Sequence, residues 1–213
     1  MEQQGTVMVK AATSLLPVVP LADLCLFPEA SLTLPPLRPA GAQALAMARR
    51  SGRRLLALAH RDPAGEPTIG NLSEIGTVAH VSYVPATEDS PAKVEIDGLH
   101  RANVVTLIHG SAFVAEVDAI DDGDPGDEWG SAVEALARYL HGRAELRAFL
   151  EGQRRSSEPM AWVNLACQHL PIALSARQKL LESDATARCR KISRGLDALL
   201  RKEHTGKVPK VKL

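Results

Sequence analysis

The sequence predicts an α+β protein in which a small β-barrel or β-sandwich with one inserted helix is followed by a bundle of helices. Short segments of alternating apolar and polar residues, separated by proline and glycine, fill roughly the first 120 positions. An acidic segment at residues 121–128 holds five acids, two glycines and a proline. Beyond it, apolar residues recur at spacings of three and four, which is typical of amphipathic helices.

The first third of the chain predicts three strands and one helix. Residues 15–21 predict an apolar strand, and its two prolines predict that it is an edge strand or an irregular one, because proline has no N–H to donate. Residues 31–37 alternate as a second strand. Alanine-rich residues 40–50, followed by Gly52, predict the inserted helix with a glycine stop, and residues 53–60 predict a buried strand.

Four more strands are predicted before the acidic segment, at residues 75–84, 93–96, 103–108 and 112–120. The pair Asp97-Gly98 predicts a turn between the second and third of these. So many short strands with a single helix favour a small closed or half-closed barrel or a sandwich.

The last third predicts four helices packed as a bundle. Ser131 to Glu134 and Ser175 to Gln178 both fit a capping box, in which two side chains satisfy free backbone N–H groups at a helix start. The other two helices start near residue 157 and residue 185. The predicted organisation is a β-rich subdomain at 14–121, an acidic linker at 122–129, a helical bundle at 130–204 and a basic disordered tail at 205–213.

Composition and charge narrow the function classes. Only 3% of the residues are aromatic, which argues against a nucleic-acid platform that stacks bases. Residues 1–130 carry 9 Lys and Arg against 17 Asp and Glu, whereas residues 131–213 carry 16 against 8. This asymmetry fits two units that attract each other, a basic rear face for an anionic partner, or simply solvated helix faces.

The three cysteines, Cys25, Cys167 and Cys189, are odd in number and have no CxxC spacing. They predict no disulfide framework and no zinc site, only buried thiols in a reducing cytoplasm. The apolar stretch at residues 15–26 is interrupted by prolines and an acid, so neither a signal peptide nor a membrane span is expected.

Motifs for catalysis and for phosphate binding are missing from the sequence. The one Gly-Lys pair, Gly206-Lys207, has Arg201 where a phosphate-binding loop requires glycine. Neither a G-x-S-x-G elbow nor an HExxH motif occurs, and the seven histidines are scattered. We therefore expect no enzyme, no cofactor and no metal, although an enzyme of unrecognised type stays an alternative.

Several segments resemble, in the same order, the N-terminal substrate-binding domain of Lon proteases. Residues 16–28, LPVVPLADLCLFP, resemble the opening of that domain. Residues 53–63, 75–79 and 93–102 are similar to its later strands, and residues 170–182 are similar to its helical part. The sequence departs from the family where an acid and an alanine replace the glycine-led turn after the opening segment.

The resemblance runs over about residues 15–203. It implies a PUA-like β-barrel followed by a helical bundle, and a module that recognises unfolded or tagged polypeptides. Because the peptidase and ATPase motifs are missing, a stand-alone, non-catalytic form is expected. It would act as an adaptor or regulator, with a partner such as a full-length Lon-type protease, and without a membrane. The alternative is an RNA-binding PUA-like protein that uses the basic helical half.

The candidate peptide-binding residues form an apolar group near the start of the chain. They are Leu24, Leu26, Phe27, Pro28 and Leu34. If they are exposed, they offer a surface for extended apolar segments. The alternative is that they are core residues of the barrel, and the sequence leaves both possibilities open.

Overall fold

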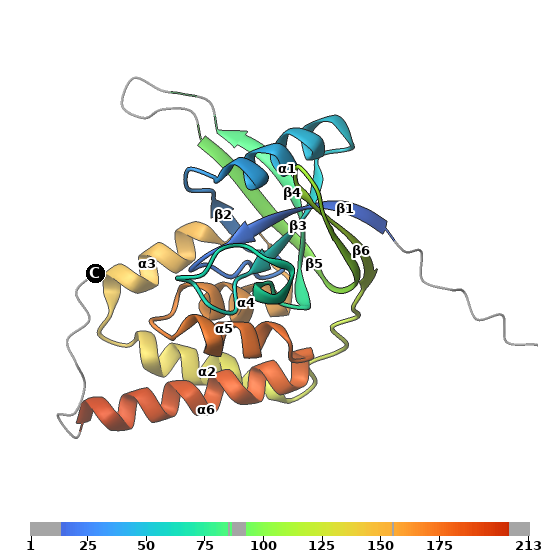
Figure 1. Ribbon diagram of the computed structural model, residues 1–213. Coiled ribbons are helices and arrows are strands. Elements are labelled where there is room, and N and C mark those ends of the chain that lie inside the picture. Colours follow the sequence, from blue (N-terminus) through green and yellow to red (C-terminus); the bar gives the residue numbers. More distant parts are fainter. Residues whose placement is uncertain (1–13, 85, 87–92, 155, 205–213) are drawn as a thin grey trace, which may run out of the picture.

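The computed structural model describes residues 14–84, 86, 93–154 and 156–204, which form a sheet-rich half and a helical half (Figure 1). The predicted tail at 205–213 lies outside these residues. The strands are β1 (Ser14–Leu21), β2 (Ser31–Thr33), β3 (Arg54–Ala59), β4 (Ile75–Val84), β5 (Lys93–His109) and β6 (Phe113–Ala119). The helices are α1 (Pro39–Arg50), the short 3-10 helix η1 (Ile69–Asn71), α2 (Glu128–Leu140), α3 (Ala144–Gln153), α4 (Pro159–His169), α5 (Leu174–Leu181) and α6 (Ala185–His204).

We call β1 to β6, residues 14–119, the β half, and α2 to α6, residues 128–204, the helical half. The strands form one mixed sheet in the order β2-β5-β4-β3-β1-β6, and β6 also pairs with β5. Only β1 and β3 run parallel; the other pairs are antiparallel. The predicted α+β class is confirmed.

Strand β1 lies inside the sheet, so the edge position, one of the two predicted alternatives, was wrong. Its first part pairs with β6 over Ser14–Val18 and its second part with β3 over Val18–Leu21. Pro17 therefore has a paired neighbour only in β6, and Pro20 only in β3. Because each proline is paired on one side, the strand accommodates two residues that lack an N–H.

Strand β5 is continuous over 17 residues, so the predicted turn at Asp97-Gly98 was wrong. The register between β4 and β5 shifts next to this glycine. Gly98 N–H donates to the carbonyl of Ala30 at 2.9 Å, and a Cβ at Gly98 would lie 2.2 Å from the carbonyl oxygen of Phe27. Glycine is needed here for the close approach of another backbone segment, not for a turn.

The helical half has five helices, one more than predicted. Gly142 adopts a positive φ of 77°, which ends α2 and separates it from α3. Both predicted capping boxes were wrong, because α2 begins at Glu128 and α5 at Leu174, upstream of the two serines. Neither helix has a side-chain hydrogen bond at its N-cap.

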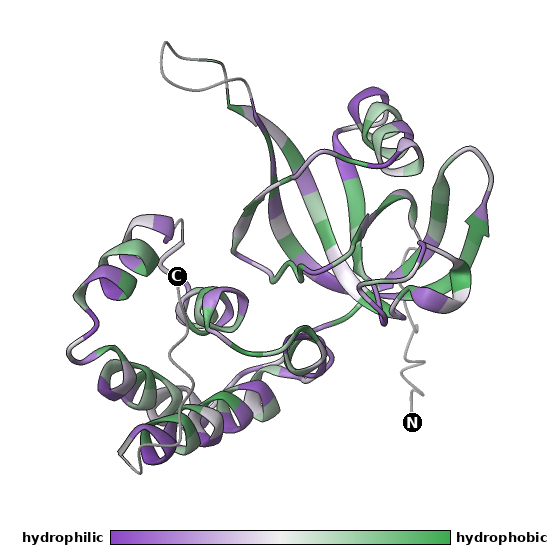
Figure 2. Cartoon of the chain, turned by 60° about the vertical axis from the view of Figure 1, so that its left-hand side comes forward, coloured by the Kyte–Doolittle hydropathy of each residue, from purple (hydrophilic) through white to green (hydrophobic). Residues whose placement is uncertain are grey.

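The buried apolar residues form three clusters, two in the β half and one among the helices. The apolar sides of the helices in Figure 2 face one another, as expected for a bundle. Cys25, Phe27 and Ala30, from the loop between β1 and β2, belong to the helical cluster rather than to either cluster of the β half. The two halves therefore share part of one core.

Candidate functional site

The five predicted peptide-binding residues lie mostly in the interior. Leu26, Phe27, Pro28 and Leu34 are buried, which favours the core alternative for these four. Leu26 and Leu34 pack in a core cluster of the β half, whereas Phe27 packs in the cluster of the helical half. Leu24 is half-buried and lines a small pocket of about 120 Å³. A role of these residues in peptide binding stays a prediction.

Gln168, on α4, connects the loop after β1 to the helical half. Its Oε1 accepts a hydrogen bond from the backbone N–H of Phe27 at 3.0 Å, and its Nε2 donates to the carbonyl of Ser31 at 2.8 Å. The side chain is buried, and both ends of its amide have protein partners. A buried amide that satisfies two backbone groups fixes the position of the loop against the helices.

Asp122, between the halves, pairs with two buried arginines. Its two carboxylate oxygens accept from Arg188 on α6 at 3.0 and 3.1 Å, and one of them also accepts from Arg101 on β5. Arg188 further donates to Asn164 at 2.6 Å, and Arg101 donates to the carbonyl of Leu181 at 3.0 Å. The acidic segment was predicted to be a linker, and within it this carboxylate joins the two halves.

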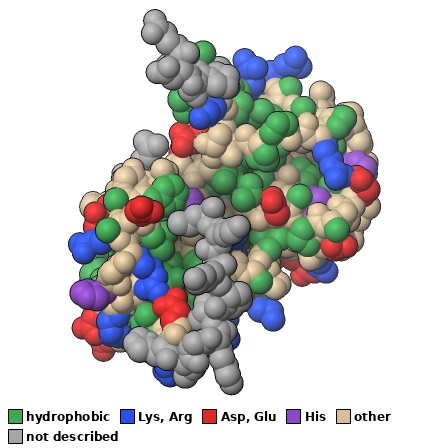
Figure 3. All heavy atoms as spheres, turned by 90° about the vertical axis from the view of Figure 1, so that its left-hand side faces the viewer, with side chains coloured by type: hydrophobic (Ala, Val, Ile, Leu, Met, Phe, Trp, Pro, Cys, Tyr) green, Lys and Arg blue, Asp and Glu red, His purple; other side chains and the backbone are tan. Residues whose placement is uncertain are grey.

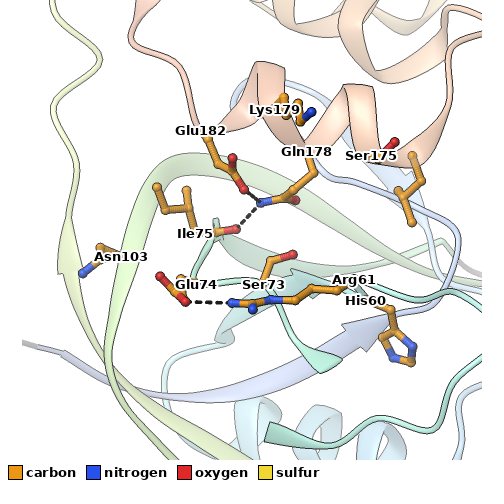
Figure 4. Close-up of a pocket in the computed structure, with 11 residues that line it drawn as sticks. His60, Arg61, Ser73, Glu74, Ile75, Asn103, Ser175, Gln178, Lys179 and Glu182 are labelled. Atoms are coloured by element: carbon orange, nitrogen blue, oxygen red, sulfur yellow. Dashed lines mark hydrogen bonds and ion pairs between the residues drawn. The ribbon is translucent and has the colours of Figure 1, made fainter. Parts of the chain in front are cut away.

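A cleft of about 490 Å³ opens between the β half and α5 (Figure 4). It is lined by His60, Arg61, Ser73, Glu74, Ile75 and Asn103 from the β half, and by Leu174, Ser175, Gln178, Lys179 and Glu182 from α5 and its end. Gln178 Nε2 donates to the carbonyl of Ile75 at 2.9 Å and to Glu182 Oε1 at 3.0 Å. Arg61 and Glu74 form an ion pair at 2.7 Å on the facing side.

The cleft presents hydrogen-bond donors and acceptors of both charge signs, which suits a polar or backbone segment as ligand. The His60 ring points away from Gln178 in Figure 4, and its Nδ1 is buried without a partner among the described residues. Burial, together with the nearby cation Arg38, lowers the His60 pKa below its ordinary value of 6.5. In the described part of the chain, no group of three His, Cys, Asp or Glu side chains is placed to hold a metal ion.

All three cysteines are buried and unpaired, as predicted. Burial raises the thiol pKa to about 12 for Cys25 and Cys167 and to about 11 for Cys189. At neutral pH they are protonated core side chains. No helix within the described ranges is long and apolar enough to cross a membrane.

Sequence reasoning missed the cleft and the polar residues that connect the halves. Gln168 and Gln178 carry no local signal, because their partners lie 141 and 103 positions away. Arg188 does carry a local signal in the sequence. It lies three residues after Ala185 and four before Ile192, on the apolar side of the last helix, where an unpaired charge is costly.

The chain was compared with known proteins. The model of the substrate-binding domain of ATP-dependent protease La (LON) matches residues 15–198. A Lon protease of Xanthomonas oryzae is 28% identical over 181 residues, which cover 78% of this chain and 21% of the relative. A Lon protease of Desulfovibrio desulfuricans is 30% identical over 139 residues, which cover 64% of this chain and 16% of the relative. The chain thus spans about a fifth of the length of these curated relatives.

Two solved structures share the fold. The N-terminal domain of a Mycobacterium avium complex Lon protease has a TM-score of 0.68 at 19% identity, covering 86% of this chain and 98% of that one. A Lon N-terminal domain protein from Xanthomonas campestris has a TM-score of 0.56 at 18% identity, and the match covers 88% of this chain and 98% of that one. With the match over residues 15–198, these findings confirm the expected family: the chain belongs to the LON substrate-binding domain family.

Proposed function

We propose that this chain is a non-catalytic module that recognises segments of other polypeptides, as part of protein quality control. The observation that carries the proposal is the family match over residues 15–198, because that family is described as a substrate-binding domain. The finer roles, as an adaptor or regulator beside a full-length Lon-type protease, belong to the same proposal and are supported by the relatives, which are Lon proteases.

The cleft between the halves is our first candidate for the binding site. Its walls come from two parts of the chain that are held together by Gln178 and, nearby, by Asp122. Because the walls of the cleft are already fixed, they need not become ordered when a segment binds. This lowers the entropic cost of binding. Seen from the α3 side, hydrophobic side chains also reach the surface in patches on both halves (Figure 3), and these can add apolar contacts.

Two further parts of the proposal concern the fold and the compartment. We infer that the sheet is a small PUA-like barrel, which is supported by the pairing of β5 with both β4 and β6. We also infer a reducing, cytoplasmic location, which is supported by three buried cysteines without disulfides.

The test is binding of the purified chain to a permanently unfolded protein and to its folded counterpart, without ATP, at two salt concentrations. Selective binding to the unfolded form is the expected result. Equal binding to both forms, or to neither, would overturn the proposal. If the chain binds neither the unfolded nor the folded protein but binds RNA with an affinity that falls as salt is added, the RNA-binding alternative is supported.

A pair of variants locates the site. Ser175 is exposed on the cleft wall and Ser111 is exposed in the turn between β5 and β6. Ser175→Trp should weaken binding by filling the cleft, whereas Ser111→Trp should leave it unchanged. If both variants bind like the original chain, the cleft is not the site.

A further inference from the structure

A second cavity lies in the helical half, where α5 and α6 leave an apolar groove of about 330 Å³. Its apolar lining consists of Leu170, Ile172, Ala176, Leu180, Ile192, Gly195, Leu196, Ala198 and Leu199. Its charged lining residues are Lys179, Lys191 and Lys202, and no acid lies among the described residues that line it. The groove thus combines an apolar floor with a positively charged border.

Gly195 keeps one part of this groove open. It lies in the middle of α6, where glycine costs about 1 kcal/mol of helix stability relative to alanine. A Cβ at this position would meet nothing within 4 Å. Packing therefore does not require glycine here, and the missing side chain leaves free space that an incoming side chain can fill.

We propose that the groove binds an acidic amphipathic segment of a partner polypeptide, with apolar residues on the floor and Asp or Glu beside the lysines. Lys191 and Lys202 are separated by eleven positions on α6, which corresponds to about 16 Å along the helix. That length matches about three turns of a bound helix, with apolar side chains at positions i, i+3 or i+4, and i+7. The inference rests on the proposed function and specifies its substrate class.

The charges argue against two other occupants. A second copy docked face to face would bring the same lysines together across a two-fold axis, where like charges repel. The chain's own residues 205–213 contain three lysines and no acid, so their charge does not complement the border. An acidic partner is the occupant that complements both the floor and the border.

The test uses three synthetic peptides of about 14 residues, measured by fluorescence anisotropy at two salt concentrations. The first carries a leucine stripe flanked by glutamates, the second has lysines in place of the glutamates, and the third is a scrambled form of the first. We expect the first to bind at least about tenfold more tightly than the other two, with weaker binding at high salt. Equal or tighter binding of the lysine peptide would overturn the proposal.

Variants locate this binding. Gly195→Leu fills the groove and should weaken binding of the acidic peptide about tenfold or more. Lys191→Glu should weaken the acidic peptide and strengthen the lysine peptide. Arg194→Glu, at an exposed position of α6 that does not line the groove, is the matched control and should change binding less than about twofold. If Gly195→Leu fails to fold, Lys191→Glu decides alone.

The two proposals fail in different ways. If the chain binds an unfolded protein but Gly195→Leu and Lys191→Glu bind the acidic peptide as the original chain does, the groove proposal is wrong and the proposed function stands. If neither the unfolded protein nor any peptide binds, both are wrong.

Discussion

The two halves build their cores in different ways. Every buried member of the two clusters in the β half comes from residues 16–117, within that half. The cluster of the helical half also takes in Cys25, Phe27 and Ala30, and half-buried Ile75 packs against it. The β half therefore supplies its own core, whereas the helical half completes its core with residues from the β half. Stability of the helices should depend on the sheet more than the reverse.

Asp122 offers the most severe way to break the connection between the halves. Asp122→Ala leaves Arg101 and Arg188 buried at 2% and 0% side-chain exposure without their carboxylate, so we expect a loss of about 5 kcal/mol in the free energy of unfolding. Urea denaturation measures this loss. Asp127→Ala, at an exposed position in the same segment, is the control and should cost less than about 0.5 kcal/mol. Similar losses for both would show that Asp122 does not connect the halves.

Two phenylalanines, each 0% exposed, allow a direct comparison of the cores. Phe27→Ala removes a side chain from the helical cluster and Phe113→Ala removes one from the β half, and each should cost about 3–5 kcal/mol. Amide hydrogen exchange should distinguish the two variants. Phe27→Ala should lower protection in α4 and α6 far more than in β4, whereas Phe113→Ala should lower protection in both halves. Uniform loss of protection with Phe27→Ala would contradict the asymmetry.

Gly98→Ala should have a smaller effect on the same contact. The added Cβ would lie 2.2 Å from the Phe27 carbonyl oxygen, so the loop must move away from β5. We expect a loss of about 1–3 kcal/mol in the free energy of unfolding, measured by thermal or urea denaturation. Gly110→Ala, where a Cβ meets nothing within 4 Å, is the matched control. A Gly98→Ala variant as stable as the control would show that the loop does not need this close approach.

The smallest expected effect is a pH dependence. Burial lowers the pKa of His60 in the β half and of His169 in the helical half below 6.5. On acidification through pH 6.5, the unfolded chain takes up these protons before the folded chain does, so the free energy of unfolding should fall below that pH. Urea denaturation between pH 7.5 and 5.5 measures the slope. His60→Gln and His169→Gln should each flatten it, and a slope as steep as that of the original chain in both variants would contradict the prediction.

The sequence predicted the parts of the fold that local patterns determine. Strand β4 matches its predicted bounds, residues 75–84, and the inserted helix starts and ends within one residue of the prediction. Alternation and helix-stop signals depend on neighbouring residues in the sequence, so they can be recognised without knowing the tertiary contacts. The Asp97-Gly98 pair was misinterpreted because glycine can permit either a turn or a close approach, and the neighbouring segment that decides between them lies about 70 positions upstream.

The candidate site was less predictable for a related reason. An apolar group such as Leu26 and Phe27 has the same sequence pattern whether it forms a binding surface or a core, and only its packing against residues distant in the sequence decides between the two. The cleft depends on α5 meeting the β half, a contact that no local pattern indicates. The groove is easier to predict from the sequence than the cleft, because its floor and its lysines lie on helices that are neighbours in the chain.

The shared core also has a consequence for how the chain emerges from a ribosome. Phe27 is synthesised 141 residues before Gln168, the residue whose amide holds its backbone. At ordinary translation rates this gap corresponds to about 7–30 s. The last strand of the sheet ends at Ala119, 49 residues before Gln168, and at that stage the benzyl ring that will belong to the helical core has no helical partner. A nascent chain of this protein therefore passes through an interval in which it displays an apolar side chain that the folded protein buries.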